Sequence, residues 1–206
     1  MKLLLVCAGT KKEGTTNRAL EEAKSAISVW GGEFEVLSLY SASIPSCSGC
    51  GWCKGGSGCV HNDLARTLAE MSRDFDAFIF FTPVHFGGAS GVLKSALGRA
   101  FYSRRAHFEH KPALTVSVSR RGGNFTAIEE INRFFLFANM TVVAGNYPPI
   151  LHGESALDAE EDKEGLQSIR SAVSELLWIC RCIELGKKSG FFPFFSEDKI
   201  KTSYIR

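Results

Sequence analysis

The sequence predicts an α/β protein in which a parallel sheet is covered by helices on both faces. Short runs rich in Val, Ile, Leu and Phe alternate along the chain with stretches whose apolar residues recur at helical spacing. Five strand-and-helix pairs of this kind follow one another, and such an alternation leads to a parallel, doubly wound sheet with right-handed crossovers. The length of 206 residues suits one well-packed domain.

Each element has its own signal in the sequence. The first strand is predicted over 3–8, a continuous apolar run that is typical of a strand buried on both faces. The β-prone runs that predict the other strands lie at 34–39, 76–82, 114–119 and 141–144, and Pro83 closes the third strand of the five. Helical spacing of apolar residues predicts helices around 19–30, 64–71, 91–101, 128–135 and 166–183. Gly31 and Gly32 end the first helix, and Asn62 or Asp63 caps the second.

Composition excludes several classes of protein. The net charge is +2 and the Lys and Arg residues are scattered, which gives no support for nucleic-acid binding. No apolar run reaches the roughly 20 residues of a membrane helix, and Met1 to Ala8 is interpreted as a buried strand rather than a signal peptide. Free thiols in this number indicate a reducing cytoplasm. We expect a domain over 1–188 and a tail over 189–206, whose aromatic residues are Phe191, Phe192, Phe194 and Phe195.

Four cysteines in one glycine-rich segment, 46–60, carry the strongest functional signal. They are spaced C-x2-C-x2-C-x5-C, at Cys47, Cys50, Cys53 and Cys59. A tight loop with this rhythm can present three thiolates to one iron–sulfur cube, and a fourth cysteine just beyond completes the set. Zinc remains an alternative, although structural zinc favours two separated knuckles. Redox-active thiols without metal are a second alternative. A disulfide framework is disfavoured because the seven cysteines are odd in number.

Three other cysteines are interpreted as ordinary residues. Cys7 ends the first apolar run and is expected in the core. Cys180 and Cys182 lie two positions apart on the last predicted helix, so their side chains point in different directions and are poor candidates for one shared ligand site.

Loops that follow the predicted strands could hold a flavin, because ligands of open α/β sheets bind beyond the carboxyl ends of the strands. The first loop, 9–17, opens a helix with hydroxyls and glycine, so it could cradle a phosphate monoester, although an ordinary polar turn is the alternative. The third loop, 82–88, offers aromatic faces and glycines, and the fourth, 119–124, offers backbone donors and cations for the pyrimidine edge of a flavin. His85 and Phe86 could also be a plain loop residue and a core residue. The candidate residues are Thr10, Lys12, Gly14, Thr15, Thr16 and Asn17 for the phosphate, Pro83, Val84, His85, Phe86 and Gly87 beside the ring, and Arg120, Arg121, Gly122 and Gly123 at its edge.

Together these segments resemble the iron–sulfur flavoproteins, a branch of the flavodoxin-like NAD(P)H-dependent FMN reductase superfamily. The similarity rests on the cysteine quartet and the following His61-Asn62-Asp63, on the 82–87 loop, on Lys94 and Arg99 of the next helix, and on Arg121-Gly122-Gly123. It covers Met1 to about Lys188. The resemblance implies a flavodoxin-like five-stranded parallel sheet of order 2-1-3-4-5 with the cysteine-rich insertion after its second strand. It also implies bound FMN, a [4Fe–4S] cluster near it, and a homo-oligomer, a homodimer or homotetramer.

The expected function is therefore an FMN-dependent oxidoreductase that couples a [4Fe–4S] cluster to FMN. The cysteines would be ligands, and no side chain is assigned as a general acid or base because the cofactors carry the chemistry. A small redox carrier such as ferredoxin, or NAD(P)H, would be the donor and a small molecule the acceptor. The alternative enzyme is a cluster-free NAD(P)H-dependent flavin, quinone or nitro reductase. Outside enzymes, a flavodoxin-like electron carrier or a zinc-stabilised binding module remains, although a carrier usually shows a face of one charge sign.

Overall fold

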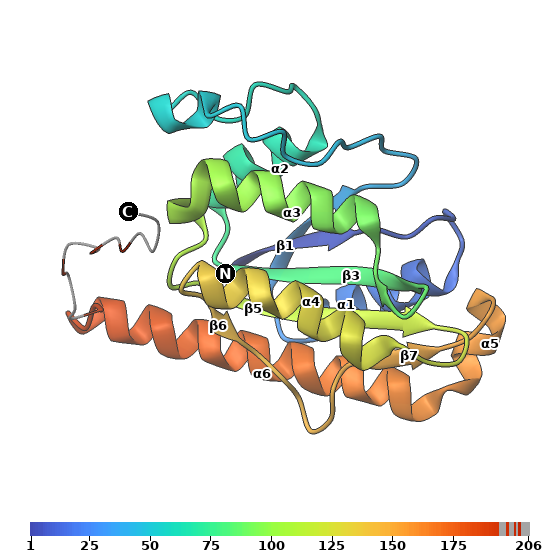
Figure 1. Ribbon diagram of the computed structural model, residues 1–206. Helices are drawn as coiled ribbons and strands as arrows, with labels where there is room; N and C mark the ends of the chain where they lie inside the picture. Colours follow the sequence, from blue (N-terminus) through green and yellow to red (C-terminus); the bar gives the residue numbers. More distant parts are fainter. Residues whose placement is uncertain (194–196, 198–199, 201, 203–206) are drawn as a thin grey trace.

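A parallel sheet lies between two layers of helices in the computed structural model, which describes residues 1–193, 197, 200 and 202 (Figure 1). The strands are β1 (Lys2–Cys7), β2 (Glu33–Ser38), β3 (Ala77–His85), β4 (Gly88–Ala89), β5 (Pro112–Ser119), β6 (Thr141–Val142) and β7 (Ile150–His152). The α-helices are α1 (Thr15–Val29), α2 (Leu64–Met71), α3 (Gly91–Arg104), α4 (Asn124–Phe137), α5 (Ala156–Glu161) and α6 (Lys163–Lys188). Short 3₁₀ turns are Trp52–Gly55, Ser72–Asp74 and Arg105–His107.

The main path of the sheet is β2-β1-β3-β5-β6, and every pair along it is parallel. In the centre, Leu3 of β1 is level with Phe34 of β2 on one side and with Ala77 of β3 on the other. Because β4 is a two-residue strand on the side of this path, the path follows the expected order 2-1-3-4-5. The predicted flavodoxin-like α/β class is confirmed.

Within the described part of the chain, the sheet has seven strands rather than the five that were predicted. The fifth predicted strand, 141–144, shrinks to β6, and the chain returns to β5 as a separate parallel strand, β7. Pro148 and Pro149 lie in the excursion between them and cannot donate to a ladder. The third strand also passes through Pro83, which is level with Val118, instead of stopping there. It then turns back as a hairpin with β4.

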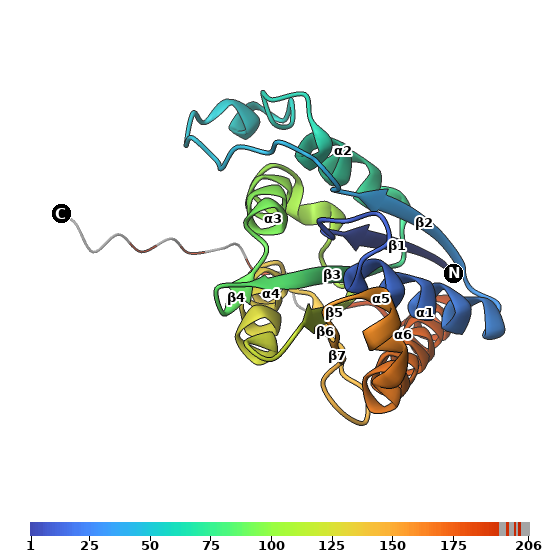
Figure 2. The same ribbon diagram turned by 90° about the vertical axis from the view of Figure 1, so that its right-hand side faces the viewer.

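Two hydrophobic cores, one on each face of the sheet, hold the layers together. Alternate residues of a strand point to opposite faces, so Leu5 of β1 belongs to the core that includes residues of α1, α5 and α6, whereas Leu4 belongs to the core that includes residues of α2, α3 and α4. Figures 1 and 2 show these two helix layers on either side of the sheet. Both leucines are fully buried. Burial on both faces is the reason that the first strand reads as an unbroken apolar run.

The last helix, α6, ends at the same edge of the sheet at which the strands begin (Figure 1). Beyond it, Phe191 and Phe192 are exposed, and Phe194 and Phe195 of the predicted tail lie outside the described residues. Among the residues that the structure describes, no helix has both the length and the apolar content of a membrane span.

Candidate functional site

The helices that begin near the carboxyl edge of the sheet differ in whether a side chain caps their first turn. No side chain caps the first turn of α1, α3 or α4, the helices that follow β1, the β3–β4 hairpin and β5. In contrast, Asp63, Ser155 and Asp162 cap α2, α5 and α6. The first N–H groups of a helix need partners, and such groups together with the helix dipole attract anions. The carboxyl edge therefore offers three helix starts to an anionic ligand.

The first loop combines exposed and buried candidates for the phosphate. Thr10 and Lys12 are exposed, while Thr15 and Thr16 at the start of α1 are buried. The Thr15 hydroxyl already donates to the carbonyl of Gly153 across 3.2 Å. What this loop can offer a phosphate is therefore chiefly backbone N–H groups and the exposed hydroxyl and ammonium of Thr10 and Lys12.

The third loop is the tip of the β3–β4 hairpin. His85 pairs with Gly88, and Phe86 and Gly87 form the turn between them, with φ of 48° and 80°. Two positive φ values are the signature of the tight turn that suits a two-residue hairpin. Phe86 is fully exposed, so it is not the core residue that the sequence allowed. Its ring is free to lie against a ligand at this edge.

The fourth loop packs directly against the third. At Gly123 (φ 86°) a Cβ atom would lie 2.8 Å from Gly87 Cα and 2.9 Å from Val84 Cγ1. Glycine is therefore required both by the backbone conformation and by the close approach. Arg120 and Arg121 are exposed. The predicted residues of the third and fourth loops thus belong to one surface.

Two residues that the sequence analysis missed join the first loop to the fourth. His152 ends β7, and its Nδ1 lies 3.4 Å from the Ser119 hydroxyl, which donates to the Asn124 side chain across 2.6 Å. Gly153 follows and accepts from Thr15. Contacts therefore run from the first loop through 152–153 and the fourth loop to the third. The pairing of β7 with β5 creates this link, and no strand was predicted at 150–152.

The four clustered cysteines line one pocket on the outer side of α3. Cys47, Cys50, Cys53 and Cys59 are all free thiols, and the pocket is completed by α3 residues that include Arg99 and Tyr102. The spacing motif therefore does gather its cysteines. Among the described residues, no three His, Cys, Asp or Glu side chains lie close enough to hold a single metal ion. Four thiol donors around one hollow suit a larger group, because an iron–sulfur cube takes a set of four cysteine ligands.

Arg99 of α3 connects this pocket to Asp63, the residue that caps α2. Its side chain is 1% exposed and pairs with both oxygens of Asp63, at 2.6 and 2.9 Å. Nε and Nη2 also donate to Cys59 Sγ across 3.3 and 3.2 Å. Burial alone would raise the pKa of Asp63, but the hydrogen bonds and charge of Arg99 outweigh it and hold that pKa below its ordinary value. Both groups of the pair are therefore ionised at neutral pH.

The cysteine pocket and the carboxyl edge are distinct places in the fold. Arg99 lies eight residues after Gly91, where α3 begins, so it is displaced about 12 Å along the helix from its start at that edge. The cysteine segment covers α2 and α3, as Figures 1 and 2 show. Of the remaining cysteines, Cys7 and Cys180 are buried and Cys182 is exposed, as expected for residues outside a shared site.

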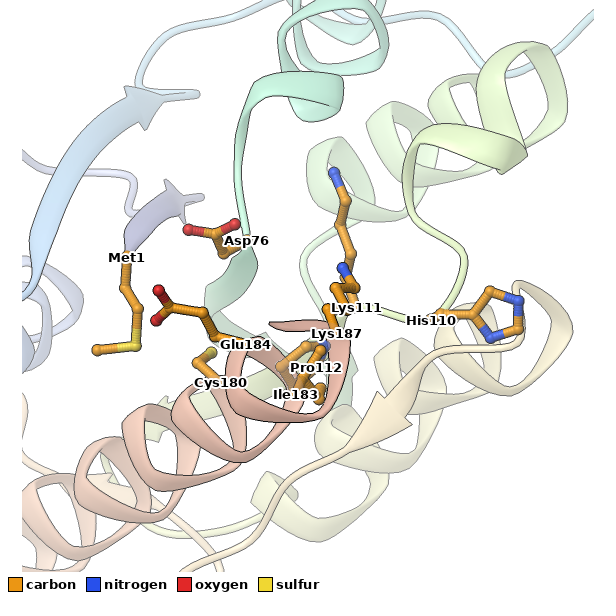
Figure 3. Close-up of a pocket in the computed structure, with 9 residues that line it drawn as sticks. All are labelled: Met1, Asp76, His110, Lys111, Pro112, Cys180, Ile183, Glu184 and Lys187. Carbon is orange, nitrogen blue, oxygen red and sulfur yellow. The ribbon is translucent and has the colours of Figure 1, made fainter. Parts of the chain in front are cut away.

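Another pocket lies at the opposite, amino edge of the sheet (Figure 3). Lys111 and Lys187 line it together with Asp76, Glu184 and Cys180. Burial raises the pKa of Cys180 to about 12, so this thiol stays protonated. Ligands of such sheets bind at the carboxyl edge, so this pocket is not the candidate flavin site.

Comparison with known proteins identifies the family. The model of the family described as NADPH-dependent FMN reductase matches residues 1–154. The chain belongs to the NADPH-dependent FMN reductase family. It is an FMN-dependent oxidoreductase, and the resemblance noted from the sequence is confirmed. An iron–sulfur flavoprotein of Methanocaldococcus jannaschii is 30% identical over 193 residues, which cover 89% of this chain and 100% of that protein.

Solved structures bear out the fold of this FMN reductase family member. A crystal structure of RosB with bound 8-demethyl-8-formylriboflavin-5'-phosphate matches with a TM-score of 0.70 at 15% identity and covers 100% of this chain and 94% of that one. A flavodoxin from the domain Archaea matches with a TM-score of 0.61 at 11% identity, over 88% and 99% of the two chains. Both likenesses concern the fold alone.

Proposed function

We propose that this FMN-dependent oxidoreductase couples FMN, bound at the carboxyl edge of the sheet, to a [4Fe–4S] cluster held by Cys47, Cys50, Cys53 and Cys59. The observation that carries the proposal is that four free cysteines line one pocket while a buried guanidinium donates to one of their sulfurs. A cluster passes single electrons and a flavin passes one or two, so the pair would connect one-electron and two-electron carriers.

The chain's own residues have defined tasks at the flavin. Thr10, Lys12, Gly14, Thr15, Thr16 and Asn17 hold the phosphate, chiefly through the backbone N–H groups of the uncapped start of α1. Pro83, Val84, His85, Phe86 and Gly87 lie beside the ring. Arg120, Arg121, Gly122 and Gly123 face its pyrimidine edge, where cations and N–H groups stabilise negative charge. To these we add His152 and Gly153, which tie the first and fourth loops together.

The electron donor is NAD(P)H or a small redox carrier such as ferredoxin, and the acceptor is a small molecule. The family description supports the nicotinamide. Free cysteines at exposed positions support a reducing compartment, and we place the protein in the cytoplasm. We further propose that it forms a homodimer or homotetramer.

Anaerobic purification with analysis of iron, acid-labile sulfide and flavin tests the proposal. We expect about four iron and four sulfide ions per chain, as a [4Fe–4S] cluster requires, with one FMN. The Cys50→Ser variant should lose iron and sulfide but keep FMN. Cys182→Ser, at an exposed cysteine of α6, is the matched control and should keep all three. Stoichiometric FMN without iron in the unaltered protein would contradict the cluster.

A cluster-free NAD(P)H-dependent flavin, quinone or nitro reductase is the second candidate. It is favoured by the position of the cysteine pocket on the outer side of α3, about 12 Å along the helix from the start that faces the flavin edge. Rapid mixing with NADPH separates the two candidates. Fast and complete bleaching of the flavin in iron-free protein supports the second candidate, whereas dependence of flavin reduction on bound iron supports the first.

A further inference from the structure

Arg99 is the one charged side chain among the buried residues that the structure describes. Its five N–H groups are engaged: Nη1 donates to Asp63 and to the carbonyl of Pro45, and Nη2 to Asp63, Cys59 and the carbonyl of His61. Nε donates to Cys59. A buried cation of this kind needs compensating anions. Asp63 supplies one, and the sulfur of Cys59 is the other group toward which the guanidinium is aimed.

Such an arrangement has a specific consequence for a metal-bound sulfur. A neutral thiol is a weak hydrogen-bond acceptor, so two N–H donors on one sulfur are best used when that sulfur carries negative charge. Reduction of a cluster adds one electron and therefore more negative charge to its thiolates, without breaking any bond. Donors on those sulfurs stabilise the reduced form and raise the reduction potential.

We propose that Arg99 is a positioning residue that raises the reduction potential of the cluster through Cys59, and that Asp63 limits this effect by neutralising the guanidinium. The inference rests on the proposed cluster. It makes Cys59 different from the other three ligands, because the charge-assisted donors act on its sulfur. It also predicts that changes to the two members of the ion pair shift the potential in opposite directions.

The test uses redox titration of the anaerobically isolated holoprotein, followed by electron paramagnetic resonance of the reduced cluster. Arg99→Gln removes the charge and should lower the equilibrium constant for reduction about tenfold, which is a fall of about 59 mV for one electron. Asp63→Asn leaves the guanidinium uncompensated and should raise the potential. Asn also serves as a helix cap, so this variant preserves the start of α2 that Asp63 caps.

Arg104→Gln is the matched control. Arg104 lies on the same helix and pairs with Glu70 at 3.1 Å, and in the described contacts its donors reach Glu70 and a backbone carbonyl. The reduction potential of the Arg104→Gln variant should match that of the unaltered protein. A purely structural Arg99 would instead lower the melting temperature of the Arg99→Gln variant without moving the potential.

The outcomes separate the two proposals. If the unaltered protein binds no iron, the proposed cluster fails. If iron and sulfide are bound and Asp63→Asn leaves the potential unchanged or lowers it, the inference about Arg99 is overturned while the cluster stands. Should Arg99→Gln not retain its cluster, Asp63→Asn still decides, because a raised potential in that variant supports the inference.

Discussion

Lys111, at the amino edge of the sheet, shows how one residue ties stability to pH. Its ammonium donates to the carbonyls of Ser72 and Arg73 across 2.8 and 3.0 Å. Burial lowers its pKa to about 8, although the negative charge of Asp76 acts in the opposite direction. The ordinary pKa of lysine in an unfolded chain is about 10.4. Between these two values the unfolded chain binds more protons than the folded one, so the free energy of unfolding must rise with pH.

We therefore expect the stability of the protein to increase from pH 8 to about 10 through this residue. The Lys111→Met variant should show a smaller increase, and Lys11→Met, at an exposed lysine of the first loop, should show the same increase as the unaltered protein. Urea unfolding at a series of pH values measures how the free energy of unfolding increases with pH in each protein. An equal rise in Lys111→Met would mean that other groups cause the effect.

The placement of residues was predictable from the sequence where it depends on spacing along the chain. The rhythm of the four cysteines was enough to predict that they share a site, and they do line one pocket. The bond from Arg99 to Cys59 was not predictable, because it joins residues 40 positions apart and depends on how the cysteine segment folds over α3. His152 was missed for a similar reason, since its role comes from the pairing of β7.

Between elements, the third and fourth loops pack so closely that there is no room for a Cβ atom at Gly123. A side chain at Gly123 would both strain a backbone with φ of 86° and collide with the β3–β4 hairpin. We expect Gly123→Ala to lower the free energy of unfolding by about 1–2 kcal/mol from the left-handed conformation alone. FMN binding should weaken as well, because the two loops are pushed apart.

Gly122→Ala is the matched control for this prediction. An added Cβ at Gly122 meets no described atom within 4 Å, so that variant should retain its stability. Thermal unfolding and a fluorescence titration with FMN measure both effects. Equal behaviour of the two variants would show that the packing of these loops does not support the flavin.

Element types were well predicted, and element boundaries less so. Helix α2 was expected at 64–71 and lies at Leu64–Met71 with Asp63 as its cap, because its cap and its apolar spacing are local signals. The fifth strand could not be placed from local signals, since Thr141 to Ala144 has high β-propensity but only Thr141 and Val142 form the strand that pairs with β5. Strand pairing depends on distant partners, and propensity alone is a weak guide to it.

For the molecule as a whole, the two cores share one sheet and should unfold together. Leu68 is fully buried in the core beneath α2, and Leu176 in the core beneath α6. Replacing either leucine by alanine should lower the free energy of unfolding by about 2–5 kcal/mol. Each variant should still melt in a single transition. Leu185→Ala, at an exposed position of α6, should change stability by no more than about 0.5 kcal/mol.

Calorimetry of the three variants measures these effects. Two separate transitions in either core variant would show that the helix layers fold independently. The doubly wound arrangement itself was predictable, because alternation of strands and helices leaves few other solutions. Contacts between the loops at the carboxyl edge were not predictable, because they depend on the relative placement of strands that lie far apart in the sequence.

The hydrogen bonds of the cysteine segment, 46–60, have a consequence for how this fold can change in evolution. Its side-chain hydrogen bonds reach α2 and α3, through Arg66, Ser95 and Arg99, while the loops at the carboxyl edge hold one another through separate contacts. The segment 46–60 could therefore be replaced without breaking the contacts among those loops. A lineage could gain or lose this segment in one event while the carboxyl edge stays assembled.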